Sequence, residues 1–303
     1  MGLSKKSKMN IGLALGALGV AGVSALLAYG VRKADPRFYR TKFGPAVVCT
    51  TTDADGRAVR LLLVGRSVQS ATYVDEEYRA EPVFDYYLAF DLMFDAKPDI
   101  ERVLMVGGGG YAYPKHIIAT RPEVHMDVVE IDPAITRIAL TDFYLAEYLS
   151  DYPFGGTYDL GRICADGCGY LADLSRVVQG ELVGEGCDSE FACQARRRYG
   201  AGFGQRYDAM VFDVFAGKKP VASLASPATI RNAHTCLNPG GVLIANVVST
   251  LEGPKSTFLH QYVEALEGEF AHVHVIPLSP DGTDAPDNGI LLATDATWEF
   301  AGM

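Results

Sequence analysis

Residues 103–117, VLMVGGGGYAYPKHI, indicate the fold class of this 303-residue chain. An apolar run ends in four consecutive glycines, Gly107 to Gly110, and a segment with helical character follows. Glycine allows a positive φ and lets a ligand approach the backbone, and the free N–H groups at the start of a helix attract a polar ligand. The stretch therefore predicts a strand, a ligand-binding turn and a helix.

Strands and helices are predicted to alternate in this way to the end of the chain. Helices fill most of the gaps between short apolar strands, which are predicted near residues 102–106, 125–130, 160–164, 207–213, 241–248, 272–277 and 289–293. Strands that alternate with helices form a mostly parallel sheet covered on both faces. We therefore predict a Rossmann-like, doubly wound α/β domain over residues 81–303, with its ligand beyond the carboxyl ends of the strands.

Residues 43–80 have a different pattern, rich in β-branched residues and interrupted by the turn sequence Asp53-Ala54-Asp55-Gly56. The pattern predicts a small antiparallel β domain of hairpins, ahead of a helix near residues 82–94. Its strands are expected at 46–52, 58–64 and 68–74.

Residues 1–42 hold an apolar segment and its basic flanks. Met9 to Val31 carries no charge over about 23 positions, and a helix of that length spans a hydrocarbon core of ~30 Å. The run exceeds the ~7–15 residues of a signal-peptide core, and no small-x-small cleavage site precedes Arg32. We therefore predict an uncleaved transmembrane helix in preference to a signal peptide.

The flanks of this segment bear on its orientation. Lys5, Lys6 and Lys8 precede it, and a larger group of Lys and Arg follows it. This favours a single-pass membrane protein with a cytoplasmic catalytic domain, although the charge difference is small. Gly12 and Gly16 form a GxxxG step, which is compatible with helix pairing in a homodimer but is common by chance in a glycine-rich span.

The charge and the cysteine content of the chain limit the kinds of ligand and partner that it can bind. The net charge is −10, and residues 43–303 alone hold 19 basic and 36 acidic residues, a net charge of −17. Such a surface repels nucleic acid and can attract a cationic substrate, although ordinary solubility explains it equally well. The six cysteines lack zinc-site spacing, so no metal site is predicted. Only Cys187 and Cys193 lie in a stretch that suggests a disulfide.

Residues 179–206 do not follow the α/β rhythm, because they are rich in glycine and charge and lack a clear period. We interpret them as an insertion. A lid over the ligand and a tolerated surface insertion are equally good hypotheses.

Acidic residues follow three of the predicted strands. Glu130 lies about 20 residues beyond the glycines, where a carboxylate can accept hydrogen bonds from both hydroxyls of a ribose. Asp166, with the small Gly167 behind it, can accept from an adenine amino group, or it can cap the next helix. Asp213 can accept a proton from an attacking amine, with a cap or a structural hydrogen bond as the alternative.

The ordered set of these residues resembles the spermidine synthase (polyamine aminopropyltransferase) family, and the four-glycine form with YAYPKHI resembles its membrane-associated branch. The resemblance covers about residues 57–294. Its motifs are LLLVGRSVQS, DEEY, VEIDP, ADGCGYL, FDVFAG, LNPGGVLIANVVS and APDNGILLATD. It implies a sheet of the S-adenosylmethionine-dependent methyltransferase type and a transferase of polyamine biosynthesis that acts on a small-molecule amine.

The resemblance also implies roles for single residues. The co-substrate is an adenosyl-sulfonium compound, decarboxylated S-adenosylmethionine or S-adenosylmethionine, and no tightly bound cofactor is expected. Asp213 is the implied catalytic base, and Tyr78 of DEEY, one residue shorter than the family's DExxY, is the implied partner of the polyamine. The residues implied to bind the co-substrate are Gln69, Gly107, Gly109, Glu130, Asp166 and Gly167.

Two departures from the family's usual sequence argue against a standard diamine substrate. The family's glycine loop usually reads GGGDGG, and its Asp holds the amino group of the decarboxylated donor, whereas this chain has Gly110. The family usually has a second Asp three residues after the base, for the far amine of the acceptor, whereas this chain has Ala216. A buried ammonium without a carboxylate costs several kcal/mol.

Three hypotheses of function follow in order of preference. The first is transfer of an aminopropyl group to an amine, with Asp213 as base. The second is methyl transfer from intact S-adenosylmethionine, which the loss of the acid at Gly110 suits. The third is a non-catalytic, membrane-tethered nucleotide-binding domain. A nicotinamide dehydrogenase, which the GxGxxA match of Gly107–Ala112 would suggest alone, comes last because no hydride-transfer residues are recognisable.

Overall fold

The computed structural model describes residues 35–298, apart from 54, 66, 152–155, 181–182, 185–186, 189–194, 196–197, 201–202, 217–218, 254–255 and 279–286. The predicted anchor at residues 9–31 lies outside this part of the chain, as does Cys193 of the suggested disulfide. Within the described part, every helix is too short or too polar to cross a bilayer.

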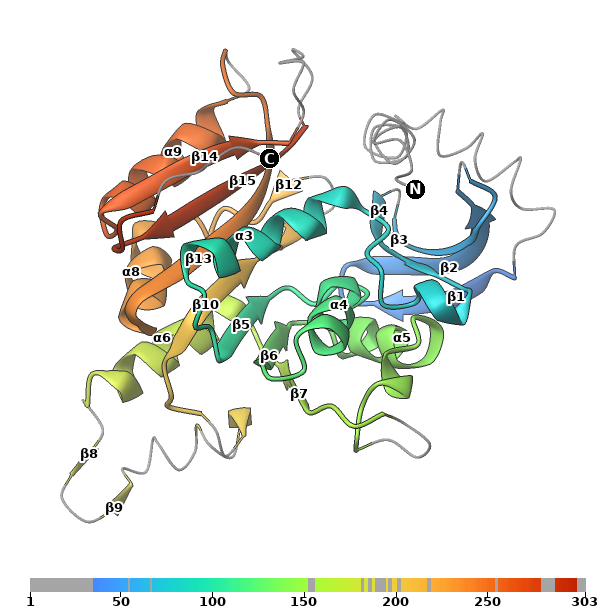
Figure 1. Cartoon of the computed structure of the whole chain (residues 1–303), viewed down its shortest axis with the longest axis horizontal. Helices are drawn as coiled ribbons and strands as arrows, with labels where there is room; N and C mark the ends of the chain where they lie inside the picture. Colours follow the sequence, from blue (N-terminus) through green and yellow to red (C-terminus); the bar gives the residue numbers. More distant parts are fainter. Residues whose placement is uncertain are drawn as a thin grey trace.

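A seven-stranded sheet forms the centre of the molecule, in the order β14-β15-β13-β10-β5-β6-β7 (Figure 1). The five strands from β13 to β7 are parallel, and β15 is antiparallel to both of its neighbours. Every predicted strand of the α/β domain is present, so the Rossmann-like prediction is confirmed. The bounds are β5 Arg102–Val106, β6 His125–Glu130, β7 Leu160–Cys164, β10 Tyr207–Phe212, β13 Leu237–Ser249, β14 His272–Pro277 and β15 Asp287–Thr294.

Helices cover both faces of this sheet because its strands are apolar on both sides. In β5, Val103 and Met105 point into one core, whereas Leu104 and Val106 point into the other. The first core is covered by the 3₁₀ helix η2 (Asp85–Asp91) with α3 (Leu92–Ala96) and α4 (Ala112–Thr120). The second is covered by α6 (Gly167–Val178), α8 (Pro227–Thr235) and α9 (Thr257–Glu267). The helix expected near residues 82–94 thus forms, largely as η2.

The small N-terminal sheet has four antiparallel strands, β1 Arg37–Thr41, β2 Gly44–Thr52, β3 Ala58–Val64 and β4 Ser67–Tyr73. The last three match the predicted runs. Strand β1 was not predicted, since its sequence RFYRT lies in the segment assigned to the basic flank of the anchor. One face of the sheet packs against α5 (Pro133–Asp142), and the other forms a separate apolar cluster.

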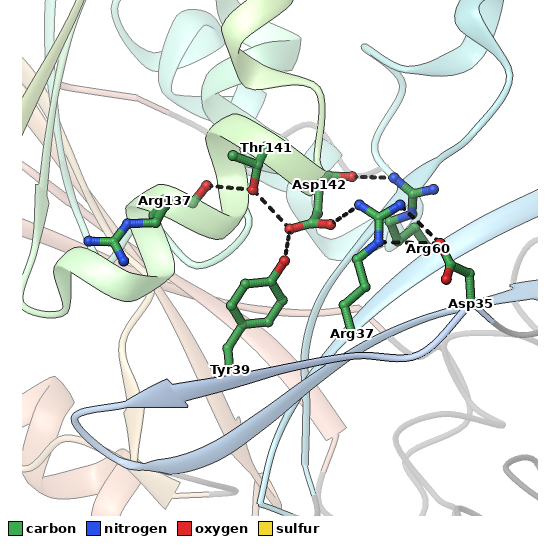
Figure 2. Close-up of polar contacts among 7 residues, drawn as sticks. All are labelled: Asp35, Arg37, Tyr39, Arg60, Arg137, Thr141 and Asp142. Atoms are coloured by element: carbon green, nitrogen blue, oxygen red, sulfur yellow. Dashed lines mark hydrogen bonds and ion pairs between the residues drawn. The ribbon is translucent and has the colours of Figure 1, made fainter.

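Asp142, the last residue of α5, attaches this sheet to the α/β domain (Figure 2). Its buried carboxylate accepts hydrogen bonds from Arg37 Nη1 at 2.5 Å and from the Tyr39 hydroxyl at 2.6 Å. Arg60 Nη1 donates to the Asp142 carbonyl oxygen at 2.8 Å. Burial, and then the bond to Asp142, raises the pKa of Tyr39. A buried carboxylate needs such partners, so these contacts hold the two parts in one orientation.

The insertion at residues 179–206 begins at the end of α6 and ends at the start of β10. Both ends of the insertion lie at the amino edge of the parallel strands. Helix α6 starts at the carboxyl end of β7 and runs back to the amino edge, where β10 begins. Two short strands, β8 (Val183–Gly184) and β9 (Cys187–Asp188), lie far from the glycine turn in Figure 1. Tyr199 packs on Tyr170 of α6, with ring centres 5.1 Å apart. The choice between a lid and a surface insertion stays a prediction.

Candidate functional site

The glycine turn lies where β5 ends and α4 is about to begin. Gly107 has a φ of +94° and Gly109 a φ of +49°, both in the region that favours glycine. A Cβ atom on Gly107 would lie 2.3 Å from the carbonyl oxygen of Asp213, so β5 and β10 can approach only with glycine at this position. The prediction that these glycines form a special backbone turn is confirmed.

Tyr111, the residue before α4, has a φ of +56° although it is not glycine. Its buried ring lies beneath the turn, because a Cβ on Gly108 would be 2.6 Å from Tyr111 Cε2. The hydroxyl forms a 3.1 Å hydrogen bond with Thr136 Oγ1 of α5. A left-handed conformation costs a non-glycine residue about 1–2 kcal/mol. Such strain gathers at ligand sites, and no sequence signal pointed to Tyr111.

Glu130 lies directly below this turn, at the end of β6. Its Oε2 accepts from the amides of Gly108 at 3.0 Å and Gly109 at 3.4 Å, and its Oε1 accepts from the amide of Asp132 at 2.9 Å. Burial raises the pKa of Glu130, and the three amide bonds oppose that rise. The carboxylate thus shapes the turn, and its oxygens have further acceptor capacity for a ligand.

Asp166 follows β7 and caps α6. Its Oδ1 accepts from the amide of Gly169 at 2.8 Å. The helix-cap interpretation is therefore realised, and the adenine role of this exposed carboxylate stays a prediction. A Cβ on Gly167 would lie 2.4 Å from Val106 Cγ1, so close packing against β5 requires its small size.

Gln69 reaches the turn from the small sheet. Its carbonyl oxygen in β4 would lie 3.8 Å from a Cβ on Gly109. The structure therefore places the backbone of β4 beside Gly109, and the co-substrate role of Gln69 stays a prediction.

Asp213 follows β10 and is held by two side chains from distant parts of the chain. The Tyr86 hydroxyl of η2 donates to Asp213 Oδ2 at 3.2 Å, and Asn246 Nδ2 of β13 donates to Oδ1 at 3.0 Å. Burial raises the pKa of Asp213 to about 6, against the opposing effect of these two bonds. Asn246 is 5% exposed, and its Oδ1 has no hydrogen-bond partner within the described residues. A buried acceptor therefore lies beside the predicted base.

The tyrosine that contacts this carboxylate is Tyr86, and Tyr78, the implied partner of the polyamine, lies elsewhere. Tyr78 packs edge-on against Tyr73, with ring centres 6.0 Å apart, and its ring also faces Arg57. These contacts place Tyr78 in the apolar cluster of the small sheet, whereas Tyr86 contacts Asp213. The role of Tyr78 stays a prediction. The sequence analysis missed Tyr86 because DEEY drew attention to the earlier tyrosine.

Gly110, where the family usually has an acid, has no room for a side chain. A Cβ there would lie 2.5 Å from Ser70 Oγ and 2.6 Å from the Phe143 ring, and both residues are fully buried. The side chains of Ser70 and Phe143 thus fill the space that an acidic side chain at position 110 would need. Ala216, at the second departure, lies in the two-residue strand β11 (Phe215–Ala216), which pairs with β12 (Lys219–Pro220).

Lys115 of α4 is a buried amine near this packing. Its Nζ donates to Thr72 Oγ1 at 2.7 Å and to the Phe143 carbonyl oxygen at 2.8 Å. Burial lowers the pKa of Lys115 to about 7. The amine joins β4, α4 and the end of α5.

The structure thus gathers the glycine turn, Gln69, Glu130 and Asp213 at the carboxyl edge of the sheet, with Asp166 at the neighbouring strand end. Within the described ranges, no cluster of three or more His, Cys, Asp or Glu residues could hold a metal ion. The arrangement can bind a ligand against the turn and remove a proton beside Asp213.

No family model matches the chain, but two curated proteins are similar in sequence. A polyamine aminopropyltransferase from Vibrio vulnificus is 28% identical over 189 residues, 61% of this chain and 50% of that protein. The human eEF1A lysine and N-terminal methyltransferase is 26% identical over 194 residues, 59% of this chain and 23% of that protein. The aligned part is therefore about half of the bacterial relative and a quarter of the human one.

Solved structures with a similar fold include two spermidine synthases. A probable spermidine synthase from Corynebacterium glutamicum has a TM-score of 0.63, with 18% identity over 88% of this chain and 82% of that one. A spermidine synthase in complex with the transition state analogue AdoDATO has a TM-score of 0.55, with 13% identity over 87% of this chain and 74% of that one. At these identities the likeness establishes the fold.

Proposed function

We propose that this spermidine synthase-like chain binds an adenosyl-sulfonium compound at the glycine turn and transfers an aminopropyl group from it to an amine. One observation carries the proposal. Asp213, with its pKa raised to about 6, lies beside the turn and is oriented by Tyr86 and Asn246. A general base works best with a pKa near the working pH and a fixed orientation, and Asp213 meets both conditions.

The transfer step is a displacement at carbon. The amine nitrogen attacks the carbon next to the sulfonium, the new N–C bond forms as the C–S bond breaks, and the electron pair of that bond goes to sulfur. Methylthioadenosine leaves as a neutral thioether. The proton lost by the nitrogen goes to Asp213, and Asn246 Oδ1 is suited to accept a second N–H of the amine. Alignment and a base suffice, because the sulfonium is a good leaving group.

The co-substrate lies along the carboxyl edge in this proposal. Glu130 accepts from the ribose hydroxyls, Asp166 from the adenine amino group, and Gln69 borders the nucleotide from the small sheet. The similarity to a polyamine aminopropyltransferase and to the fold of a spermidine synthase bound to AdoDATO supports this placement.

Methyl transfer from S-adenosylmethionine is the second candidate. The packing at Gly110 favours it, since no acid is available there to hold the amino group of a decarboxylated donor or to repel the carboxylate of an intact one. The similarity to the human methyltransferase supports it too. A non-catalytic nucleotide-binding domain is the third.

We further propose that residues 9–31 anchor the chain as a single-pass membrane protein with this domain on the cytoplasmic side. The support is the uncharged length of the segment and the larger basic cluster that follows it. Such a topology would give the domain access to the cytoplasmic pool of adenosyl compounds.

Mass spectrometry of products tests the proposal. The full chain is incubated with a diamine and with either decarboxylated S-adenosylmethionine or S-adenosylmethionine. With the decarboxylated donor we expect an aminopropylated amine and methylthioadenosine in equal amounts, and about a 10²–10⁴-fold loss of rate in Asp213→Asn. Asp295→Asn, a surface carboxylate paired with His234, serves as the matched control and keeps its activity.

Other outcomes separate the alternatives. A methylated amine with S-adenosylhomocysteine would establish methyl transfer instead. A thermal shift with adenosyl compounds but no product would favour the non-catalytic domain. The absence of any shift with an adenosyl compound would rule out both transferase hypotheses, and full activity in Asp213→Asn would refute the base assignment.

A further inference from the structure

The hairpin formed by β1 and β2 presents the two most exposed large apolar side chains of the described residues. Phe38 is 76% exposed and Phe43 is 61% exposed. Phe38 lies on the outer face of β1, because its neighbours Arg37 and Tyr39 point to the other face and contact Asp142. Phe43 lies in the turn, where Thr41 pairs with Gly44. One hairpin thus exposes two phenyl rings to solvent.

Two basic residues are neighbours of these phenylalanines in the hairpin. Arg40 shares the outer face with Phe38, Lys42 lies next to Phe43 in the turn, and both are exposed. The remainder of the chain, residues 43–303, has a net charge of −17. This positive, aromatic hairpin is therefore opposite in charge to the domain that carries it, and an anionic partner fits it.

The position of the hairpin in the chain identifies that partner. The uncharged segment of residues 9–31 ends six positions before Arg37, and six residues reach at most ~21 Å when fully extended. A bilayer that held the segment would hold the hairpin within reach of its headgroups. Phenyl rings beside Lys and Arg are the usual composition of a surface that enters the lipid interface.

We propose that the outer face of the β1–β2 hairpin rests on an anionic lipid bilayer. Phe38 and Phe43 enter the boundary between headgroups and acyl chains, while Arg40 and Lys42 contact lipid phosphates. The proposal concerns residues other than Asp213 and its hydrogen-bond partners, and it does not depend on which group the enzyme transfers.

The contact also orients the candidate site. The amide of Lys42 donates a hydrogen bond to Asp132 Oδ2, and Asp132 caps α5 two residues after Glu130. The hairpin turn is thereby fixed to the carboxyl edge of the sheet. A docked hairpin holds this edge near the bilayer surface, so an amine that gathers at anionic lipid would reach the site over a short path.

A fluorescence experiment on the full chain in vesicles tests the proposal. Phe43→Trp is made in a Trp298→Phe background, so that one indole reports on the hairpin. Val275→Trp in the same background is the control, because Val275 is 39% exposed on β14, at the opposite side of the molecule in Figure 1. Vesicles contain phosphatidylglycerol or only phosphatidylcholine, with or without acyl chains brominated near the headgroup.

We expect bromolipid quenching of the Phe43→Trp reporter in anionic vesicles and none of the Val275→Trp reporter. Arg40→Glu with Lys42→Glu should abolish the quenching, while flotation with the vesicles continues through residues 9–31. Equal quenching of the two reporters, or none of either, would overturn the proposal. So would a blue shift of Phe43→Trp that depends on protein concentration without lipid, since that result assigns the face to a second copy.

Discussion

At the scale of the residue, the surroundings of Asp213 decide its chemistry. The carboxylate follows a central strand, where burial raises its pKa to about 6. Two hydrogen bonds stop the pKa from rising further. The group is therefore ionised at neutral pH and yet more basic than an ordinary aspartate, which is the state a proton acceptor requires.

The pH dependence of turnover follows from this balance. We expect kcat/KM to fall as the pH falls through about 6, because Asp213 becomes protonated. Tyr86→Phe removes a hydrogen bond that lowers this pKa, so the acidic limb should move to higher pH. Tyr113→Phe, a buried tyrosine bonded to Asp91 instead, should leave the limb in place. A limb that does not move in Tyr86→Phe would show that this bond does not tune the base.

Gly110 and Gly109 form a matched pair for testing the packing. Gly110→Asp forces a side chain into Ser70 and Phe143 and buries a charge, so we expect a loss of about 3 kcal/mol or more in the free energy of unfolding. Gly109→Asp has its nearest neighbour at 3.8 Å and should cost only ~1–2 kcal/mol for the left-handed backbone. Urea denaturation measures both. Equal losses would mean that the space at Gly110 is not closed.

At the scale of the element, buried polar groups join the small sheet to the α/β domain. Asp142 at the end of α5 binds Arg37 and Tyr39 of β1, and Lys115 of α4 binds Thr72 of β4. Such groups tolerate only one arrangement, because a buried donor or acceptor without a partner is costly. They hold β4, and with it Gln69, against the glycine turn.

Lys115 makes this junction sensitive to pH. Its pKa falls to about 7 on folding from 10.5 in the unfolded chain, so the unfolded state binds more protons between these values. Stability contributed by this group should therefore rise with pH from about 7 to 10.5. We expect the gain in urea midpoint between pH 7 and pH 9.5 to shrink in Lys115→Met. Lys97→Met, which removes an exposed salt bridge to Asp99, is the control. An unchanged gain in Lys115→Met would contradict this assignment.

At the scale of the whole molecule, charge is unevenly distributed. The domain beyond residue 42 is strongly acidic, whereas residues 1–42 hold eight basic residues and one acidic residue. The negative field of the domain favours the approach of a cationic amine, and the positive end favours an anionic surface. The acidic domain suits the proposed amine substrate, and the basic N-terminal part suits the proposed anionic bilayer.

Salt should therefore weaken substrate capture. We expect the KM for a diamine to rise as NaCl shortens the Debye length from about 30 Å at 0.01 M to about 8 Å at 0.15 M. The KM for a monoamine should rise less, since it carries one charge instead of two. Steady-state kinetics at fixed pH measures both. A KM that is independent of salt would mean that the acidic surface serves solubility alone.

The sequence by itself determined the order of strands and helices, the special turn at Gly107–Gly110 and the acidic residues at the strand ends. These features are local, because apolar periodicity and glycine punctuation act over a few residues. The positions of Glu130 and Asp213 beside that turn followed from a general rule of parallel sheets.

Only the tertiary structure decided which side chains meet. Tyr86 lies 127 residues from Asp213 in the chain, and nothing local distinguished it from Tyr78. The closed space at Gly110 depends on Ser70 and Phe143 from two other elements. Strand β1 pairs with β2, and Asp142 binds two of its side chains, although its own sequence resembles a basic linker. Contacts between distant segments depend on packing in three dimensions, and local patterns do not contain them.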